Sequence, residues 1–184
     1  MSSADSRLIA AAVEELMEHG YRGATTKSIA ERAGVNEVTL FRRFGTKRDL
    51  MTQALDTVTT PFRQSMVEPT YDLVTDLVSI AGAYASMVDR EPRLVSRVIP
   101  ELTTEPELRD VVTSLQQPVI DALRALFTSH QEAGRLVDGH VDDLMRAFLG
   151  PLAARAFMAY ILEPKPFDAS AHVQRFLEGH RPRT

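Results

Sequence analysis

Apolar residues recur every three or four positions along most of the chain, and no stretch alternates strictly between apolar and polar residues. Spacings of three and four are typical of helices that bury one face, whereas strict alternation would predict strands. The first helix is predicted over 5–19, with Asp5 as its N-cap and Gly20 just after its last apolar repeat, where glycine commonly closes a helix. The pattern therefore predicts an all-α protein.

Two short helices are predicted next, over 25–33 and 36–43. Thr25 and Asn36 are suited to cap their first turns, and Gly34 between them allows the chain to reverse. Two short helices around a glycine turn, after a longer first helix, predict a helix-turn-helix unit whose second helix enters the major groove of DNA. The apolar residues expected to hold the two helices together are Ile29, Ala30, Ala33, Val35 and Leu40.

The remainder of the chain is predicted to be helical from 46 to about Pro61 or somewhat beyond, and over 72–89, 92–103, 106–133, 141–162 and 168–179. Pro118 is expected to kink the helix 106–133 or to split it in two. Apolar residues surround almost the whole of 141–162, so this helix is expected to be buried on most sides. The predicted organisation is a DNA-binding domain, residues 1–50, followed by a helical domain, residues 51–184.

The composition fits an ordinary globular protein: 44% of the 184 residues are hydrophobic and 25% are charged. No apolar run is long enough to span a membrane and no secretory signal is visible at the N-terminus, so we expect a cytoplasmic protein without membrane contact. The chain has no cysteine, and its five histidines form no spaced metal motif such as HExxH. Neither a metal site nor a cofactor is therefore expected.

Positive charge is concentrated in one short segment. Residues 22–48 contain seven basic and two acidic residues, a local balance of +5, although the whole chain carries a formal net charge of −4. The rest of the chain therefore carries −9. Because this segment coincides with the predicted helix-turn-helix, we interpret it as a DNA-binding surface rather than as an ordinary solvated face.

Residues 20–50, GYRGATTKSIAERAGVNEVTLFRRFGTKRDL, resemble the DNA-binding domain of TetR-family transcriptional regulators. The family pattern has a glycine that ends the first helix, a threonine before an Ile-Ala pair, then Ala-Gly-Val, a Thr-Leu-Tyr in the recognition helix, and a phenylalanine followed three residues later by lysine. The matching residues are Gly20, Thr25, Ile29-Ala30, Ala33-Gly34-Val35, Thr39-Leu40-Phe41 and Phe44 with Lys47. With the first helix included, about 45 residues, a quarter of the chain, carry this resemblance.

The resemblance implies contacts to the DNA backbone from three positions. Thr25 and Lys47 would contact phosphates, and Arg43 stands where the family often has a histidine or tyrosine that contacts the backbone. Phe41 replaces the usual tyrosine, so its ring can pack against the sugar-phosphate backbone but cannot donate a hydroxyl hydrogen bond. A place in the small domain's core is an equal alternative for Phe41 and is the expected place of Phe44.

The positions that would face base edges are those of Glu37, Val38, Thr39 and Arg42. An arginine here is suited to guanine, a glutamate to the amino group of cytosine, and the methyl groups of valine and threonine to the thymine methyl. The resemblance thereby implies sequence-specific reading of double-stranded DNA by the second short helix.

The resemblance also implies a homodimer through the last two helices, 141–162 and 168–179, and a palindromic operator, because a two-fold dimer places two recognition helices about 34 Å apart. A helix buried within its own monomer is the alternative for 141–162. A small-molecule effector would bind among the central helices and release the operator. Effector-binding candidates are Met66, Tyr84, Met87, Phe127, Met145, Phe148, Arg155, Phe157 and Met158.

Ordinary core packing is the alternative for these methionines and aromatic residues. Arg155 lies within an apolar helix, where its guanidinium needs an acidic effector or a carboxylate such as Glu101 or Asp143, or a partner at the dimer interface. The sequence contains no phosphate loop, dinucleotide fingerprint or serine elbow, so an enzyme is not expected. The prediction is a ligand-responsive repressor, and the alternative is a helical adaptor that binds another protein without DNA.

Overall fold

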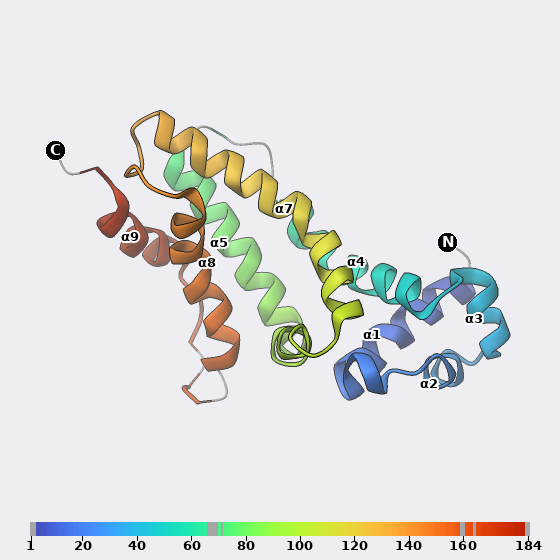
Figure 1. The fold of residues 1–184 in the computed structure, drawn as a ribbon. Helices are drawn as coiled ribbons and strands as arrows, with labels where there is room; N and C mark the ends of the chain where they lie inside the picture. Colours follow the sequence, from blue (N-terminus) through green and yellow to red (C-terminus); the bar gives the residue numbers. More distant parts are fainter. Residues whose placement is uncertain (1–2, 66–69, 71, 159–160, 164, 183–184) are drawn as a thin grey trace. The chain divides into compact units, whose positions relative to one another are not determined.

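The computed structural model describes residues 3–65, 70, 72–158, 161–163 and 165–182 (Figure 1). These residues form helices and no strand, which confirms the all-α prediction. None of the helices described has the length and hydrophobicity needed to cross a membrane. The helices are α1 (Ser3–Gly23), α2 (Thr26–Arg32), α3 (Glu37–Phe44), α4 (Lys47–Ser65), α5 (Leu73–Arg90), the π-helical segment η1 (Leu94–Val98), α6 (Ile99–Glu101), α7 (Pro106–Glu132), α8 (Val141–Met158) and α9 (Ala169–His180).

The chain folds into two compact units. The first unit consists of Met1–Thr60 and Arg93–Gln116, and the second unit consists of Pro61–Pro92 and Gln117–Thr184. The first unit thus contains the segment predicted as the DNA-binding domain together with a second segment, Arg93–Gln116, from further along the chain. Helices α4 and α7 each contribute residues to both units.

The core of the first unit is built where α1 packs on α2 and on η1. Its residues come from α1 to α4 and also from the second segment of the unit, in the form of Val98, Leu108 and Val111. The residues predicted to hold the helix-turn-helix together are buried there, except Val35, which is partly buried. Phe44 is buried as expected.

Gly20 interrupts α1 with a left-handed backbone conformation, φ 72°. One more helical turn follows it before α2 begins. The break lets the amide of Tyr21 donate a hydrogen bond to Glu101 Oε2 at 2.7 Å. A Cβ on Gly20 would collide with Glu101 Oε1. Glycine is therefore needed at this position both for its backbone conformation and for the close approach of a carboxylate from α6.

The predicted elements differ from the observed ones at three places. The helix predicted over 92–103 has a π-helical centre and α6 ends at Glu101. Pro118 lies inside α7, which continues through it as one helix, so the alternative that this proline splits the helix in two is wrong. Helix α8 ends at Met158, and the buried residues among its described side chains, Leu144, Met145, Phe148 and Leu152, lie on one side. The alternative that this helix is buried within its own monomer is therefore wrong, whereas burial against a second chain stays a prediction.

In the second unit α5 packs on α8 and α9 around a cluster of aromatic rings. Phe148 lies 5.8 Å from Phe127 and 5.2 Å from Phe176 between ring centroids, and Phe176 packs edge-on against both. His172 joins the cluster with its ring 5.1 Å from that of Phe148, and its Nε2 donates to the Phe148 carbonyl oxygen at 3.0 Å. The cluster joins α7, α8 and α9.

A buried polar pair links α5 to the end of α7. The ring of His130 places Nε2 3.4 Å from Asp76 Oδ2, while its Nδ1 accepts a hydrogen bond from Arg135 Nε at 2.8 Å. Asp76 Oδ1 accepts from the amide and the hydroxyl of Thr70 at 2.8 and 2.6 Å. Burial lowers the pKa of His130, and the charge of Arg135 lowers it further, against the opposing effect of the Asp76 and Asp72 carboxylates.

Replacing Gly20 with alanine is expected to destabilise the protein by about 2–3 kcal/mol. About 1–2 kcal/mol comes from the left-handed backbone and about 1 kcal/mol from the lost Tyr21–Glu101 hydrogen bond. Urea unfolding measures the change. Gly82→Ala is the matched control, because Gly82 lies inside α5 with no atom near an added Cβ, and it should raise stability slightly. Equal effects of the two substitutions would contradict the role of Gly20.

Stability is expected to fall as the pH drops below about 6.5, the ordinary histidine pKa. Burial lowers the pKa of both His130 and His172 in the fold, so the unfolded chain binds more protons in this range. The loss is at most about 1.4 kcal/mol per pH unit for each histidine. Urea unfolding at about pH 7.5 and about pH 5.5 tests this. His140→Gln, which removes an exposed histidine, should keep the full loss, whereas His172→Gln should reduce it; equal losses would refute the assignment.

Candidate nucleic-acid interface

Side-chain caps and one glycine fix the two short helices α2 and α3. Thr25 Oγ1 accepts from the amide of Ser28 at 3.0 Å, and Ser28 Oγ accepts from the amide of Thr25 at 3.1 Å, a reciprocal capping box at the start of α2. Asn36 Oδ1 accepts from the amide of Val38 at 2.8 Å and caps α3. Gly34, with φ 64°, turns the chain between them. The helix-turn-helix predicted from these residues is confirmed.

Helix α3 has one buried and one exposed face. Leu40 and Phe44, four residues apart, are buried. Val38, Phe41 and Arg42 are three and four residues apart on the opposite face, where Val38 is 72% exposed and Phe41 is 46% exposed. Phe41 is thus not a core residue. An exposed valine and phenylalanine beside an arginine form a surface suited to apolar and charged contacts with a nucleic acid.

The remaining predicted base-facing residues lie at the edge of that face. Glu37 is half-buried and accepts a hydrogen bond from Thr26 Oγ1 at 2.5 Å, which ties the start of α3 to α2. Thr39 is half-buried as well. The Glu37 carboxylate therefore has one oxygen held by the fold and one available to another donor.

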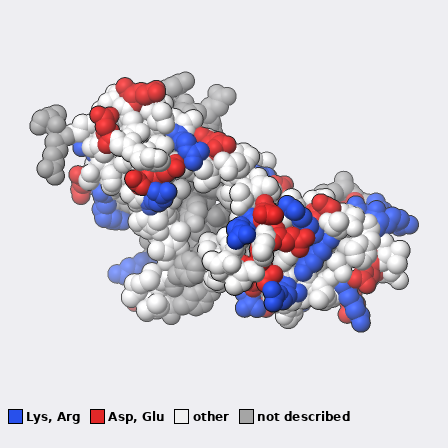
Figure 2. All heavy atoms as spheres, viewed as in Figure 1, with Lys and Arg blue, Asp and Glu red and all other residues white. Residues whose placement is uncertain are grey.

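Most of the basic residues of the segment 22–48 are paired with carboxylates. Figure 2 accordingly shows blue and red side chains intermingled on the face in view. Arg42 forms no ion pair with any residue that the structure describes, so its charge is free. The pairs are Arg22 with Glu105 at 2.8 Å, Lys27 with Glu31 at 4.0 Å, Arg32 with Glu14, Glu15 and Glu18, Arg43 with Asp5 at 3.6 Å, and Arg48 with Asp110 at 4.0 Å.

Lys47 is folded against the end of α1. Its Nζ donates to the Tyr21 carbonyl oxygen at 2.5 Å and lies 4.4 Å from the centroid of the Tyr21 ring. Burial lowers the pKa of Lys47, while Glu107, Glu105 and Glu101 oppose the shift. A lysine predicted from sequence as a phosphate contact thus also serves as an internal hydrogen-bond donor.

Comparison with known proteins agrees with this geometry. The family described as "Bacterial regulatory proteins, tetR family" matches residues 8–54. Over 165 residues, 82% of each chain, the sequence is 33% identical to the HTH-type transcriptional regulator YvkB of Bacillus subtilis strain 168. The chain belongs to the TetR family. As a TetR-family protein it is a transcriptional regulator, as the sequence analysis predicted.

Solved structures of TetR-family regulators share the fold over the full length of the chain. A tetR family transcription regulator from Shewanella sp. PV-4 has a TM-score of 0.75 at 20% identity, covering 98% of this chain and 99% of its own. The fatty acid degradation regulator FadR from Bacillus halodurans has a TM-score of 0.71 at 21% identity, covering 97% and 94%. At these identities the likeness shows the fold of this TetR-family protein.

The predicted effector residues divide between the core and two cavities of the second unit. Met87, Phe127 and Phe148 are buried in the core. Tyr84 and Met145 line a cavity of about 460 Å³ between α5, α7 and α8. The residues that line a second cavity, of about 910 Å³, include Arg155 and Met158. Met66 and the side chain of Phe157 lie outside the part of the chain that the structure describes.

Arg155 has a carboxylate partner that the sequence analysis did not name. Its Nη1 lies 2.5 Å from Asp89 Oδ1 on α5, and its guanidinium lies 5.5 Å from the centroid of the Phe167 ring. Asp143 pairs instead with Arg146, and Glu101 pairs with Arg97. The named candidates were wrong because sequence spacing carries no information about which distant carboxylate lies beside α8.

Lys47→Met is expected to lower the free energy of unfolding by about 1–2 kcal/mol, because it removes the hydrogen bond to the Tyr21 carbonyl oxygen. Arg42→Ala, at an exposed site without an ion pair among the described residues, should change it by less than about 0.5 kcal/mol. Urea unfolding of the two variants beside the parent protein provides the measurement. An unchanged stability of Lys47→Met would mean that its ammonium group is not held at Tyr21.

Proposed function

We propose that this TetR-family protein is a homodimeric repressor that binds a palindromic operator and is released from it by a small-molecule effector. The observation that carries the proposal is the exposed face of α3, where Val38 and Phe41 lie beside Arg42, which has no ion pair with any described residue. Solvent exposure of two large apolar side chains on a short helix is unfavourable in the free protein, and burial against thymine methyls and sugar rings would relieve it.

Each predicted contact has a chemical role in this proposal. Arg42 bonds a guanine edge, the free oxygen of Glu37 accepts from a cytosine amino group, and Val38 and Thr39 meet thymine methyls. Phe41 packs on a sugar ring. The backbone contacts assigned to Thr25, Arg43 and Lys47 hold the recognition helix in register. To bind a phosphate, Arg43 would break its ion pair with Asp5, and Lys47 would break its hydrogen bond to the Tyr21 carbonyl oxygen.

The exposed sides of α8 and α9 support a dimer through these two helices. On α8 Asp143 and Arg146 are exposed near the start of the helix, and the exposed residues that follow, Ala147, Gly150, Pro151, Ala154 and Met158, are small or apolar, which suits close packing against a second helix. On α9 the exposed residues include Ser170, Gln174 and Glu178. Packing the α8 helices of two chains against each other would bury these exposed residues, as the apolar sequence of this helix predicts.

The effector is proposed to occupy the cavity that Tyr84 and Met145 line together with Ile120, Leu149 and Ala153. Apolar walls with a tyrosine hydroxyl and a nearby arginine, Arg124, suit an apolar molecule with one polar end. FadR of Bacillus halodurans is named as a regulator of fatty acid degradation, so fatty acids are the first compounds to add to a protein–DNA complex.

Selection from a random double-stranded DNA pool tests the function. We expect enrichment of a palindrome with half-sites about one helical turn apart. Arg42→Ala should weaken binding by about 10–100-fold and relax one position of the half-site, while Arg109→Ala, an exposed arginine of the same unit outside the helix-turn-helix, should bind like the parent. Both variants should remain dimeric by light scattering.

Failure to enrich any sequence, repeated after unfolding and refolding the protein to remove bound ligand, would overturn the proposed DNA binding and favour the adaptor. Enrichment of a single half-site by a monomeric protein would overturn the proposed dimer. Activation of transcription from a selected site placed beside a promoter would overturn the proposed repression.

A further inference from the structure

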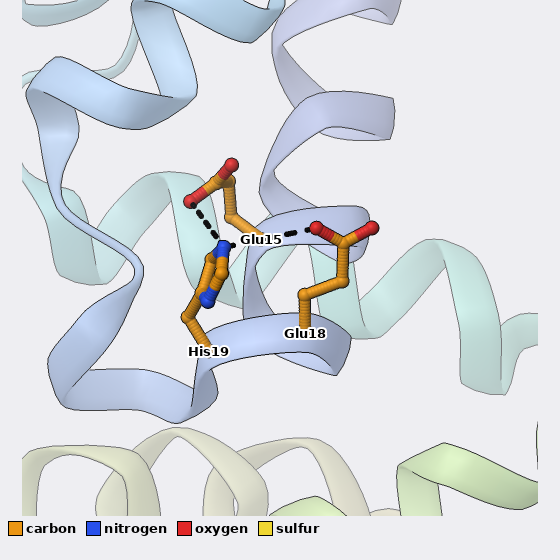
Figure 3. Close-up of side chains that lie close together, drawn as sticks. All are labelled: Glu15, Glu18 and His19. Carbon is orange, nitrogen blue, oxygen red and sulfur yellow. Dashed lines mark ion pairs between the residues drawn. The ribbon is translucent and has the colours of Figure 1, made fainter.

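One face of α1, at the turn before Gly20, carries Glu15, Glu18 and His19 (Figure 3). Positions three and four residues apart lie side by side on a helix. One carboxylate oxygen from each glutamate and one ring nitrogen of the histidine lie within 4.8 Å of one another. His19 Nε2 is 3.7 Å from Glu18 Oε2 and 4.0 Å from Glu15 Oε2. These are three potential metal-ligand atoms on one turn.

The carboxylate of Glu15 is buried, and only one of its two oxygens has a hydrogen-bond partner among the described residues. Its side chain is only 5% exposed, and its Oε1 accepts from Arg32 Nε at 2.7 Å. Its other oxygen, Oε2, is buried and has no hydrogen-bond partner among the described residues, although it faces His19. An unsatisfied buried carboxylate oxygen costs about 1–3 kcal/mol or more. A cation between Glu15 and His19 would remove that cost.

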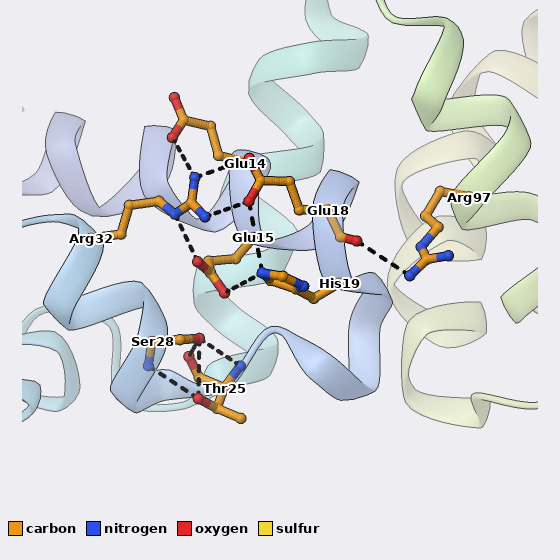
Figure 4. Close-up of polar contacts among 8 residues, drawn as sticks. All are labelled: Glu14, Glu15, Glu18, His19, Thr25, Ser28, Arg32 and Arg97. Carbon is orange, nitrogen blue, oxygen red and sulfur yellow. Dashed lines mark hydrogen bonds and ion pairs between the residues drawn. The ribbon is translucent and has the colours of Figure 1, made fainter.

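Negative charge exceeds positive charge among the side chains around this turn. Arg32 of α2 is held by Glu14, Glu15 and Glu18, so one guanidinium faces three carboxylates (Figure 4). The guanidinium of Arg97 donates to the backbone oxygen of Glu18 at 3.3 Å and not to its carboxylate. Both carboxylate oxygens of Glu18 accept from Arg32, so a metal ion would share Glu18 Oε2 with this arginine.

We propose that Glu15 Oε2, Glu18 Oε2 and His19 Nε2 bind one divalent transition-metal ion of the Zn²⁺ type, with solvent completing the coordination. Two carboxylates and an imidazole suit Zn²⁺, and three protein ligands with one open position are typical of exposed zinc sites. Bond lengths of about 2.0–2.2 Å need donor atoms slightly closer than those observed. Side chains 40% and 54% exposed, as those of Glu18 and His19 are, can rotate to close the gap.

The bound ion would act on the helix-turn-helix through Arg32. Glu15 and Glu18 connect α1 to α2 by their bonds to this arginine, and a metal ion on the same carboxylates holds them in one orientation. The sequence predicted no metal site because its histidines form no spaced motif. The site proposed here uses one histidine and two glutamates, which such a motif does not describe. The inference is independent of the proposed DNA binding.

Calorimetric titration of the chelator-treated full chain with Zn²⁺ tests the site. We expect one high-affinity ion per chain, a raised thermal midpoint, and a tetrahedral absorption spectrum when Co²⁺ replaces Zn²⁺. His19→Ala should weaken Zn²⁺ binding by about 100-fold or more, since loss of outer-shell groups alone costs about 10–100-fold. Circular dichroism confirms that this variant is folded, which the exposure of His19 leads us to expect.

Glu14→Gln is the matched control, because Glu14 lies on the same helix and accepts from Arg32 at 3.1 Å but contributes no ligand atom. It should bind Zn²⁺ like the parent protein, and so should His140→Ala. No high-affinity Zn²⁺ binding by the parent protein would overturn the proposal, and the cluster would then be an ion-pair network only. Retained binding in His19→Ala, or equal losses in His19→Ala and Glu14→Gln, would overturn it as well.

Discussion

The hydrogen bond from the Tyr21 amide to Glu101 is the contact on which the first unit most depends. It joins residues eighty positions apart and requires the left-handed Gly20 to bring the backbone within reach. Around it Arg22 pairs with Glu105, and Lys47 bonds the Tyr21 carbonyl oxygen. The peptide groups around Tyr21 therefore hold α1, α4 and the segment 93–116 together, and the helix-turn-helix is built on that base.

Local elements of this fold follow directly from the sequence. The caps of α2 and α3, Thr25 and Asn36, bond to amides two or three residues away, and Gly34 turns the chain between these helices. Because these effects are local, the residue types predict α2 and α3 closely. The same holds for Asp72 and Asp168, which cap α5 and α9. Helix ends are less predictable where proline is tolerated, since Pro61 and Pro118 both lie inside helices that continue.

Contacts between distant residues could not be predicted in the same way. Nothing in the sequence marks Glu101 as the partner of Tyr21, Asp89 as the partner of Arg155, or Lys47 as a donor to a backbone oxygen. These pairs depend on which helix faces cross in space. The family pattern predicts DNA-facing positions that lie together on one short helix, whereas the effector candidates scatter between core and cavities because their selection used residue type alone.

The ion pairs of the segment 22–48 affect how the protein searches for its site. A basic side chain that turns from its own carboxylate to a DNA phosphate exchanges one ion pair for another, so its net gain is small. We therefore expect sequence-independent attraction to DNA to be weak, because each basic side chain that binds a phosphate leaves a carboxylate without its partner. Arg42, unpaired among the described residues and set beside Val38 and Phe41, would keep its full charge for a base edge in the proposed complex. A regulator built in this way spends less time on the many competing sites of a genome.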